Sequence, residues 1–250
     1  MNHVTLGHFV CDENGHSRGG KPGDQTGKEG RFQAWYNNTS KKWQDVFRAK
    51  DKKIRKKIAQ NMIELVDNPH VGYNQDDRMS LETEAKKVDY QFSKITVDCN
   101  TDCSQATAEC IIGAGIPINP DMYTGNEKQL IEATGQFKTY DSPSYIDSDQ
   151  KLKVGDILFK IGHSAVVCKV QYILSRELVY KAGKPLMEGE DVKKVQKKLN
   201  KVMKSDIEED GEYGPKTAAE AVRFQAKKGL TPDGIVGKHT AEALGFWWEG

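Results

Sequence analysis

A cysteine at position 103 has the chemical type and the local setting that nucleophilic catalysis requires. Small and apolar residues recur at offsets of 3, 4, 7, 8 and 11 from Cys103, which predicts that it begins one face of a helix. Asp102 is a natural N-cap, so the thiol is expected in the first helical turn. There the helix dipole and unpaired N–H groups favour the thiolate. This placement suits a nucleophile, and an inert buried cysteine would fit it too.

His163 is the candidate partner for such a thiol. It follows Gly162 and opens an apolar run at residues 163–170, which predicts a buried strand. A histidine inside a strand is more often structural than catalytic, but one at the start of a strand behind a glycine can face a cleft.

The periodicity of the chain predicts the elements that must position these two residues. An apolar stripe over residues 51–68 indicates an amphipathic helix that ends at Asn68-Pro69. We expect the strand at 163–170 to pair with an antiparallel neighbour from the segment that follows it. The other expected elements are strands at 4–11, 157–160 and 174–180 and helices at 80–88 and 127–134.

Residues 12–30 are rich in Gly, Asp, Asn and Pro, a composition that predicts a long loop. Long loops inside a compact domain are usually functional or disordered. Aromatic residues follow at 32, 35, 36 and 43 and suggest that the chain then returns to a core. A site loop and a plain surface loop both fit this pattern.

Beyond residue 180 the sequence pattern changes. Residues 181–188 have linker composition, and residues 189–250 predict a small three-helix domain. This domain contains a half-repeat, because DGEYGPKTAAEAV at 210–222 matches DGIVGKHTAEAL at 233–244. We therefore expect residues 1–180 to form a first domain that carries Cys103 and His163.

The composition argues against several functions. The 37 Lys and Arg residues oppose 36 Asp and Glu residues, so the net charge of +1 gives no overall basic field for nucleic acid. No segment is apolar enough to span a membrane, and the first twenty residues hold no apolar stretch of signal-peptide length. We expect a protein that binds neither nucleic acid nor membrane, with a monomer as the default state.

The cysteines and histidines do not predict a metal site. Five cysteines, an odd number in 250 residues, are no disulfide framework. Cys99, Cys103 and Cys110 match no common zinc spacing, and the six histidines are scattered. We expect no metal and no cofactor, although a disulfide between Cys99 and Cys103 could form in an oxidising medium.

The C-terminal segment, residues 188–246, resembles a peptidoglycan-binding type 1 module. This resemblance implies bacterial peptidoglycan as the partner. The motif residues that carry it are Val195-Gln196, Leu199, Asp210-Gly211, Tyr213-Gly214, Thr217, Val222, Phe224-Gln225, Gly229-Leu230, Asp233-Gly234, Val236-Gly237 and Thr240.

The first 180 residues are similar to cysteine peptidoglycan hydrolases of the NlpC/P60 and CHAP group, in the form found in phage and prophage lysins. The similarity rests on DENG and GGKPGDQTGKE within residues 12–29, the triplet Asp102-Cys103-Ser104, and GDILFKIGHSAVV at 155–167. It implies an α+β, papain-like domain with an antiparallel sheet and a nucleophile helix. The small three-helix all-α wall-binding domain would follow it.

The resemblance also implies roles for individual residues. Cys103 would attack an amide carbonyl of the peptidoglycan stem peptide, and His163 would protonate the leaving amine. Asp102 and Ser104 match positions that contact the free amino end of the substrate or support the start of the helix. Cys99 precedes the helix, so it lacks the placement of Cys103.

The group that orients His163 is not evident from the sequence. Such enzymes usually place a His, Asn or Gln on the strand after the catalytic histidine, where this chain offers only Gln171 and Glu177. The alternative is the GDQTG loop, in which Gln25 could donate to an oxyanion. We favour Gln25 as a catalytic residue and Asp24 as a substrate contact, while Asp24 would otherwise merely cap the loop.

These features predict an endolysin-type peptidoglycan hydrolase, made in the host bacterial cytoplasm without a signal peptide and released to act on the cell wall. It would be an endopeptidase or an N-acetylmuramoyl-L-alanine amidase, since both reactions hydrolyse an amide. One alternative is a peptidoglycan-binding protein with an inactive papain-like domain; another is acyl transfer or deamidation. The C-terminal FWWEG could stack on sugars, although core packing is the commoner role.

Overall fold

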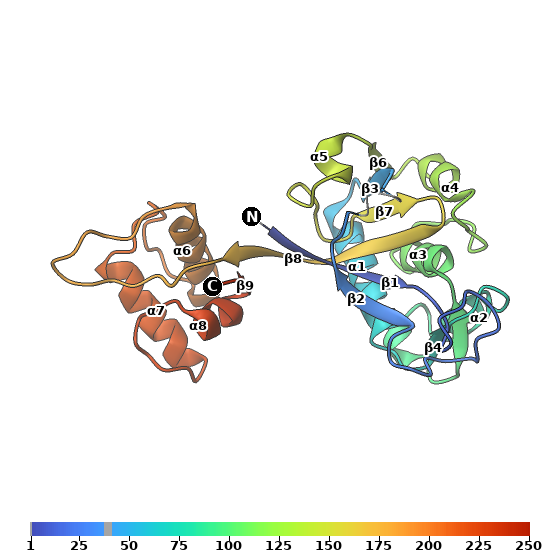
Figure 1. Cartoon of the computed structure of the whole chain (residues 1–250), viewed down its shortest axis with the longest axis horizontal. Coiled ribbons are helices and arrows are strands. Elements are labelled where there is room, and N and C mark those ends of the chain that lie inside the picture. Colours follow the sequence, from blue (N-terminus) through green and yellow to red (C-terminus); the bar gives the residue numbers. More distant parts are fainter. Residues whose placement is uncertain (1, 38–41) are drawn as a thin grey trace. The chain divides into compact units, whose positions relative to one another are not determined.

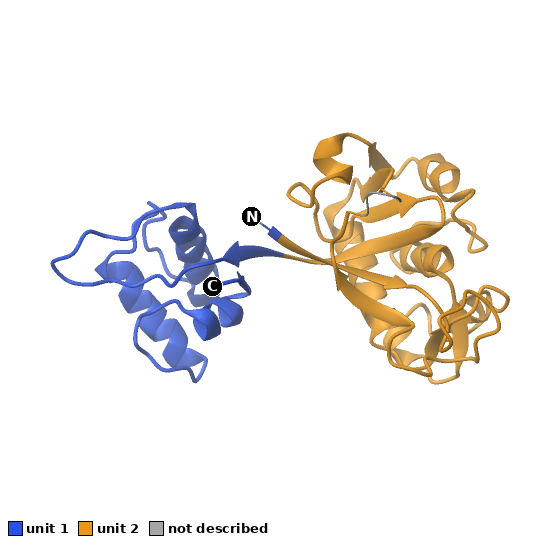
Figure 2. Cartoon of the chain, viewed as in Figure 1, with its two compact units in different colours: residues 1–2, 171–250 blue, residues 3–170 orange. Residues whose placement is uncertain are grey.

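The structure is a computed structural model that describes residues 2–37 and 42–250. The chain divides into two compact units (Figure 2): an N-terminal unit of residues 3–170, and a C-terminal unit of residues 171–250 together with Asn2. Residues 181–188, for which the sequence predicts a linker, belong to the C-terminal unit. The division falls instead within the last long strand of the chain.

The N-terminal unit is built on a mixed α/β arrangement around one sheet (Figure 1). Strands β1 and β2, β3 and β6, β3 and β7, and β7 and β8 form antiparallel pairs, so the antiparallel sheet expected from the sequence is confirmed. The strands follow the order β2-β1-β8-β7-β3-β6 across the sheet. Their bounds are Asn2–Phe9 for β1, Gly30–Ala34 for β2, Asp45–Ala49 for β3, Phe137–Tyr140 for β6, Ile157–Lys160 for β7 and His163–Leu174 for β8.

Both faces of this sheet are buried, because alternate side chains of a strand point to opposite sides. In β8, Val166 and Cys168 belong to one apolar cluster, while Ala165 and Val167 belong to another. The first cluster includes side chains of the two longest helices of the unit, and the second includes Trp43. Residues 164–168 of β8 are buried on both faces of the sheet.

The helix that the sequence predicts at residues 51–68 is confirmed as α1 (Lys52–Val66), with Asp51 as its N-cap. Ile58, Met62 and Leu65 are fully buried against the sheet. Helix α3 (Cys103–Ile112) packs in the same cluster. The remaining elements are α2 (Ser80–Lys87), the 3-10 helix η1 (Phe92–Lys94), α4 (Glu127–Ala133), α5 (Pro143–Ile146), and the parallel pair β4 (Val71–Tyr73) and β5 (Cys99–Thr101).

The neighbours of β8 differ from the sequence prediction. Residues 174–180 do not form an antiparallel strand beside it, so that prediction is wrong. Strand β8 instead lies between β7 and β1, and β1 comes from the very start of the chain. A pairing between segments so far apart leaves no local pattern in the sequence, whereas the strand at 157–160 is confirmed as β7.

The C-terminal unit contains the three predicted helices, α6 (Glu190–Met203), α7 (Pro215–Lys227) and α8 (Lys238–Leu244). A two-residue strand, β9 (Trp247–Trp248), pairs with the end of β8, so the unit is not purely helical. Phe246 is buried in the core of this unit and Trp248 packs against it. Two of the aromatic side chains of FWWEG therefore serve core packing.

The half-repeat predicted in this unit has a structural counterpart in hydrogen bonds. Gln196 is almost fully buried, and its Nε2 atom donates to Asp210 at 2.7 Å and to Thr217 at 3.1 Å. Its Oε1 atom accepts from the N–H of Gly211 at 2.9 Å. In the second half, Gln225 makes the same bonds with Asp233, Thr240 and Gly234.

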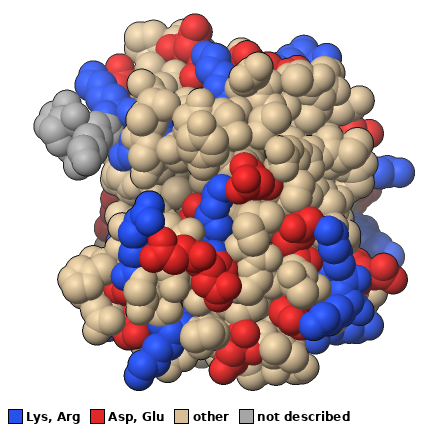
Figure 3. Space-filling view, turned by 90° about the vertical axis from the view of Figure 1, so that its right-hand side faces the viewer, with Lys and Arg blue, Asp and Glu red and all other residues tan. Residues whose placement is uncertain are grey.

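Charged side chains of both signs intermingle on the face of the molecule shown in Figure 3, and neither sign forms a continuous field there. This mixing agrees with the near-zero net charge. Among residues 2–37 and 42–250, no helix has both the length and the apolar character needed to cross a membrane.

One ion pair of the N-terminal unit is buried. Arg48 on β3 donates from Nε and a terminal nitrogen to the two carboxylate oxygens of Asp156, at 2.7 and 2.6 Å. The Asp156 side chain is inaccessible to solvent, and its Oδ2 atom also accepts from the N–H of Lys153. This pair fixes the turn that leads into β7 and from there to His163.

Replacing Asp156 by alanine should therefore destabilise the protein strongly. The variant Asp156→Ala leaves the Arg48 guanidinium buried without its carboxylate, and we expect a loss of roughly 3–5 kcal/mol in the free energy of unfolding. Urea unfolding of the full chain measures it. The matched control is Asp76→Ala, which breaks the exposed Arg18–Asp76 pair and should cost less than about 1 kcal/mol. Equal losses in the two variants would contradict the assigned role of the buried pair.

Candidate active site

Cys103 is the first residue of α3, and the predicted N-cap before it is confirmed. The Oδ1 atom of Asp102 accepts from the backbone N–H groups of Ser104 at 3.0 Å and Gln105 at 2.7 Å. It also accepts from the Ser104 hydroxyl at 3.0 Å. These bonds satisfy donors that a helix start leaves unpaired, and they hold Cys103 at a defined position.

The second carboxylate oxygen of Asp102 is also occupied. Arg78 donates to it at 3.1 Å, and the same guanidinium bonds the carbonyl of Met122 and the carboxylate of Asp121. Both oxygens of Asp102 thus have partners within the protein. The resemblance implies that Asp102 either contacts the substrate or supports the start of the helix. Its hydrogen bonds agree with the second role.

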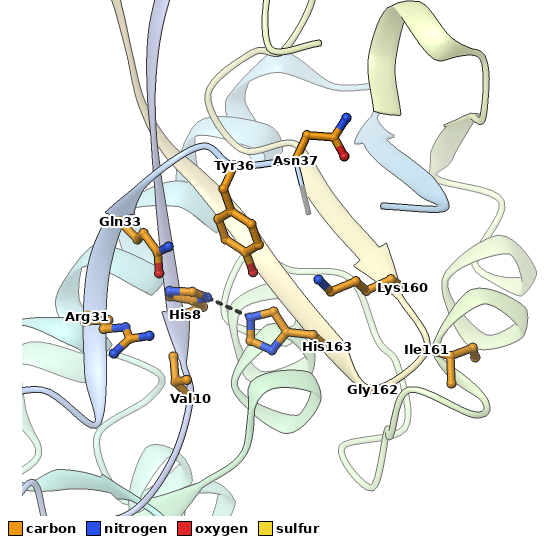
Figure 4. A pocket seen from close by; sticks show the side chains of 10 residues that line it. All are labelled: His8, Val10, Arg31, Gln33, Tyr36, Asn37, Lys160, Ile161, Gly162 and His163. Atoms are coloured by element: carbon orange, nitrogen blue, oxygen red, sulfur yellow. Dashed lines mark hydrogen bonds between the residues drawn. The ribbon is translucent and has the colours of Figure 1, made fainter. Parts of the chain in front are cut away.

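His163, the first residue of β8, meets a second histidine that the sequence analysis did not select. The Nε2 atom of His163 lies 2.7 Å from Nδ1 of His8 on β1 (Figure 4). The two rings meet edge to face, with centroids 4.9 Å apart, and the ring of Trp43 lies 6.0 Å from His163. The hydrogen bond fixes the orientation of the His163 ring, and it leaves Nδ1 of that ring for another partner.

The thiol of Cys103 lies beside the strand that carries His163. The backbone N–H of Ser164, the next residue of β8, and that of Ser104 both hydrogen-bond toward the thiol and lower its pKa. The Thr107 hydroxyl donates to the Cys103 carbonyl at 2.9 Å and lies 3.1 Å from the Ser164 hydroxyl. The start of α3 and the start of β8 are thereby tied together.

Glu127 on α4 closes this chain of hydroxyl groups. Its Oε1 atom lies 2.6 Å from the Ser164 hydroxyl, and burial raises the pKa of this carboxyl to about 8. Three hydrogen bonds then run from Glu127 through Ser164 and Thr107 to the Cys103 carbonyl. The Ser164 hydroxyl donates to Glu127, and the Thr107 hydroxyl donates to the Cys103 carbonyl.

Burial also sets the protonation of the cysteine and the two histidines. It raises the pKa of Cys103 to about 12, and the carboxylates of Asp102 and Glu127 add to this effect. Burial, with Lys160 and Arg31, lowers the pKa of His163 to about 4. Burial and His163 itself lower that of His8 to about 3. At neutral pH the site therefore holds a thiol and two neutral imidazoles, although the helix start favours a thiolate.

The glycine that precedes His163 lines two cavities. One, of about 680 Å³, contains the His163 ring, and the other, of about 310 Å³, contains Cys103; Gly162 lines both. Further residues of the first are His8, Val10, Arg31, Gln33, Tyr36, Asn37, Lys160 and Ile161. Further residues of the second are Arg18, Gln75, Arg78, Asp102, Ser104, Tyr123 and Thr124.

The structure does not bring Asp24 and Gln25 into these cavities. The Oδ1 atom of Asp24 accepts from the N–H groups of Thr26 and Gly27, at 3.0 and 2.7 Å, and so caps a turn. The Gln25 amide donates to the carbonyl of Pro22 at 2.9 Å. Neither residue lines either cavity.

The other candidates for the orienting group, Gln171 and Glu177, belong to the C-terminal unit. His8 was not predicted, because the expected place of the orienting group is the strand after His163 and the alternative is the loop at residues 12–30. A usable signal existed, since His8 also interrupts an apolar strand pattern next to a glycine.

The remaining cysteines are buried or lie outside this constellation. All five cysteines are free thiols. Burial raises the pKa of Cys99 to about 12, and its sulfur faces the carbonyl of His70 at 3.5 Å. Within the described part of the chain, no three His, Cys, Asp or Glu side chains gather closely enough to hold a metal ion.

The buried histidines should make the protein sensitive to acid. Their folded pKa values lie below the unfolded value of 6.5, so unfolding takes up protons and stability falls as the pH drops from 6.5 toward 4. Between pH 8 and pH 5 we expect each histidine to contribute a loss of roughly 2 kcal/mol. Urea unfolding at the two pH values measures this loss of stability. Amide hydrogen exchange in β1 and β8 assigns the transition to the N-terminal unit.

A variant separates this effect from general acid sensitivity. His8→Gln should reduce the loss between pH 8 and pH 5 by about 2 kcal/mol, whereas His239→Gln, at an exposed position, should leave it unchanged. An unaltered loss in His8→Gln would contradict a neutral, buried His8.

Both units of the chain match families of known proteins. The endolysin-like domain family matches residues 6–171, and the peptidoglycan binding domain family matches residues 188–244. A curated relative, the N-acetylmuramoyl-L-alanine amidase CwlL of Bacillus licheniformis, is 41% identical over 73 residues. The aligned part is 26% of this chain and 20% of that relative, so the chain spans only about one fifth of its length. No solved structure matches the chain significantly.

The match to the endolysin-like family covers the strands, the helix start and both histidines described above. The match to the peptidoglycan binding family covers α6 to α8 with their two glutamine-centred repeats. These findings support a peptidoglycan hydrolase of the endolysin type that carries a wall-binding domain. The chain belongs to the endolysin-like domain family.

Proposed function

We propose that this protein hydrolyses an amide bond of the peptidoglycan stem peptide, with Cys103 as nucleophile and His163 as general base on a papain-like fold. The observation that carries the proposal is the His8–His163 hydrogen bond of 2.7 Å, together with the Cys103 thiol, which lies at a capped helix start and accepts from the N–H of Ser164, the residue after His163. A nucleophile, its base and a group that orients the base are the three parts that such catalysis requires.

The hydrogen bonds suggest how the three groups are protonated. If Nε2 of His163 carries the hydrogen and donates to Nδ1 of His8, Nδ1 of His163 is an acceptor for the thiol proton. His8 then carries its own hydrogen on Nε2, a buried atom near the Gln33 side chain. The thiol of Cys103 and the imidazole of His163 are both neutral at rest. This agrees with a mechanism in which the proton moves from sulfur to His163 only as the sulfur attacks.

The reaction proceeds in two steps. The Cys103 sulfur bonds to the amide carbon while its proton passes to His163, and His163 returns that proton to the nitrogen as the C–N bond breaks. The amine leaves and an acyl thioester remains. Water, which loses a proton to His163, then attacks the thioester, and the thiol is restored with release of the acid.

Two groups near Cys103 are suited to stabilise the oxyanion of these steps. The N–H of Cys103 is at the helix start, where no intrahelical acceptor exists. The Tyr73 phenol lies close enough that charge on Cys103 raises its pKa, and it accepts from Gln75 at 3.0 Å, which leaves its own proton to donate. Donors fixed before the reaction stabilise developing charge without reorganisation.

The C-terminal unit would hold the enzyme on its insoluble substrate. Binding of peptidoglycan by this unit raises the effective concentration of stem peptide at the active site. Endopeptidase and amidase cleavage follow the same chemistry, and the amidase relative shares only a small part of its length with this chain. Mass spectrometry of muropeptides before and after digestion identifies the bond that is cleaved.

Replacement of the nucleophile should abolish hydrolysis. We expect Cys103→Ala to release amino groups from purified cell walls at least about 1,000-fold more slowly than the parent protein. Cys99→Ala, at another buried cysteine, serves as the control and should retain activity within about threefold. Lysis by Cys103→Ala would overturn the proposal, and a parent protein that binds walls without cleaving them would favour an inactive wall-binding protein.

Loss of the orienting histidine should lower turnover more than substrate binding. We expect His8→Ala to reduce kcat by roughly 100-fold with little change in KM, because the His163 ring loses its fixed orientation. His8→Gln should recover part of the loss, since an amide oxygen can accept from His163. A purely structural role for His8 would instead give equal effects in the two variants after correction for folded protein.

A further inference from the structure

The cavity that contains the His163 ring has a cationic wall. Arg31 on β2 and Lys160 at the end of β7 both line this space of about 680 Å³ (Figure 4). No Asp or Glu side chain is among the described residues that line it. The cavity is thus positive beside the group that handles the proton in the reaction.

The two cations differ in their setting. The Lys160 side chain is largely buried, and its Nζ lies over the rings of Trp43 and Tyr36, at 4.7 and 5.2 Å from their centres. Both rings attract the ammonium group through cation–π contacts. Arg31 is exposed, and no other described residue gives its guanidinium a hydrogen bond or an ion pair. A planar guanidinium in this state is suited to a carboxylate ligand.

The chemistry of the reaction tells which half of the substrate enters this cavity. The acyl half is bonded to the Cys103 sulfur, which lines the other cavity. The leaving amine must pass His163 to receive its proton, so the amine half extends into the cavity with Arg31 and Lys160. Gly162 lines both spaces and marks the place of the scissile bond.

We propose that Arg31, backed by Lys160, selects substrates whose amine-side half carries a free carboxylate close to the scissile bond. This inference rests on the proposed Cys103/His163 hydrolysis and assigns the polarity of its substrate. It distinguishes a stem peptide with a free carboxylate from one in which that group is a carboxamide.

A bound carboxylate would also act on His163. Both cations lower the pKa of this imidazole, so they oppose the imidazolium that forms when the thiol attacks. A carboxylate between them offsets their charge and makes His163 a stronger base. The selected substrate should therefore raise kcat as well as lower KM, and this coupling distinguishes the site from a simple anchoring contact.

The test uses two synthetic stem-peptide amides that differ only in a carboxylate or a carboxamide on the amine released. We expect the parent protein to cleave the carboxylate substrate with a kcat/KM at least about tenfold higher. Arg31→Gln should reduce this preference to within about threefold, because cleavage of the carboxylate substrate falls. Added salt should weaken the preference of the parent protein.

A matched control removes one positive charge elsewhere. Lys138→Gln lies on the exposed side of β6, outside both cavities, and should keep the full preference. Arg31→Gln should also move the acid limb of kcat/KM toward higher pH, because loss of a cation raises the pKa of His163. A merely structural Arg31 would not shift that limb.

The outcomes separate this inference from the proposed function. No preference in the parent protein, an unchanged preference in Arg31→Gln, or equal losses on the two substrates would each overturn the selection by Arg31. Hydrolysis that persists in Cys103→Ala would count instead against the catalytic proposal on which the inference rests.

Discussion

The hydrogen bond between His8 and His163 depends on β1 lying next to β8. His163 opens β8, and its neighbour in the sheet comes from the other end of the N-terminal unit. Successive side chains of β8 point to opposite faces of the sheet. His163 therefore faces His8 and Trp43, while Ser164 faces α3 and Thr107. One strand thus positions the histidine pair and also fixes the start of the helix that carries Cys103.

Burial outweighs the helix dipole in setting the resting state of Cys103. The dipole at a helix start favours the thiolate, but burial, with the carboxylates of Asp102 and Glu127, raises the pKa of the Cys103 thiol. A neutral thiol beside a neutral imidazole still supports attack, since the proton transfer can accompany formation of the sulfur–carbon bond.

The parts of this structure that sequence predicts are those with local causes. Periodic burial predicts α1, the Asp102 cap predicts the start of α3, and the glycine before His163 predicts the start of β8. His8 meets His163 across 155 positions of sequence, so no spacing rule identifies it. The sequence predicts Gln25 as a site residue because of its amide and its place in a long loop, but the amide donates to a carbonyl of its own turn.

The C-terminal repeat shows the same principle on a smaller scale. The matching Asp-Gly and Thr positions were visible in the sequence, but each pair is completed by a glutamine from the preceding helix, Gln196 or Gln225. Each glutamine is almost fully buried and uses both ends of its amide, so it cannot be replaced by an apolar residue without leaving a donor or acceptor unpaired. The repeated unit is therefore a helix with the turn that follows it.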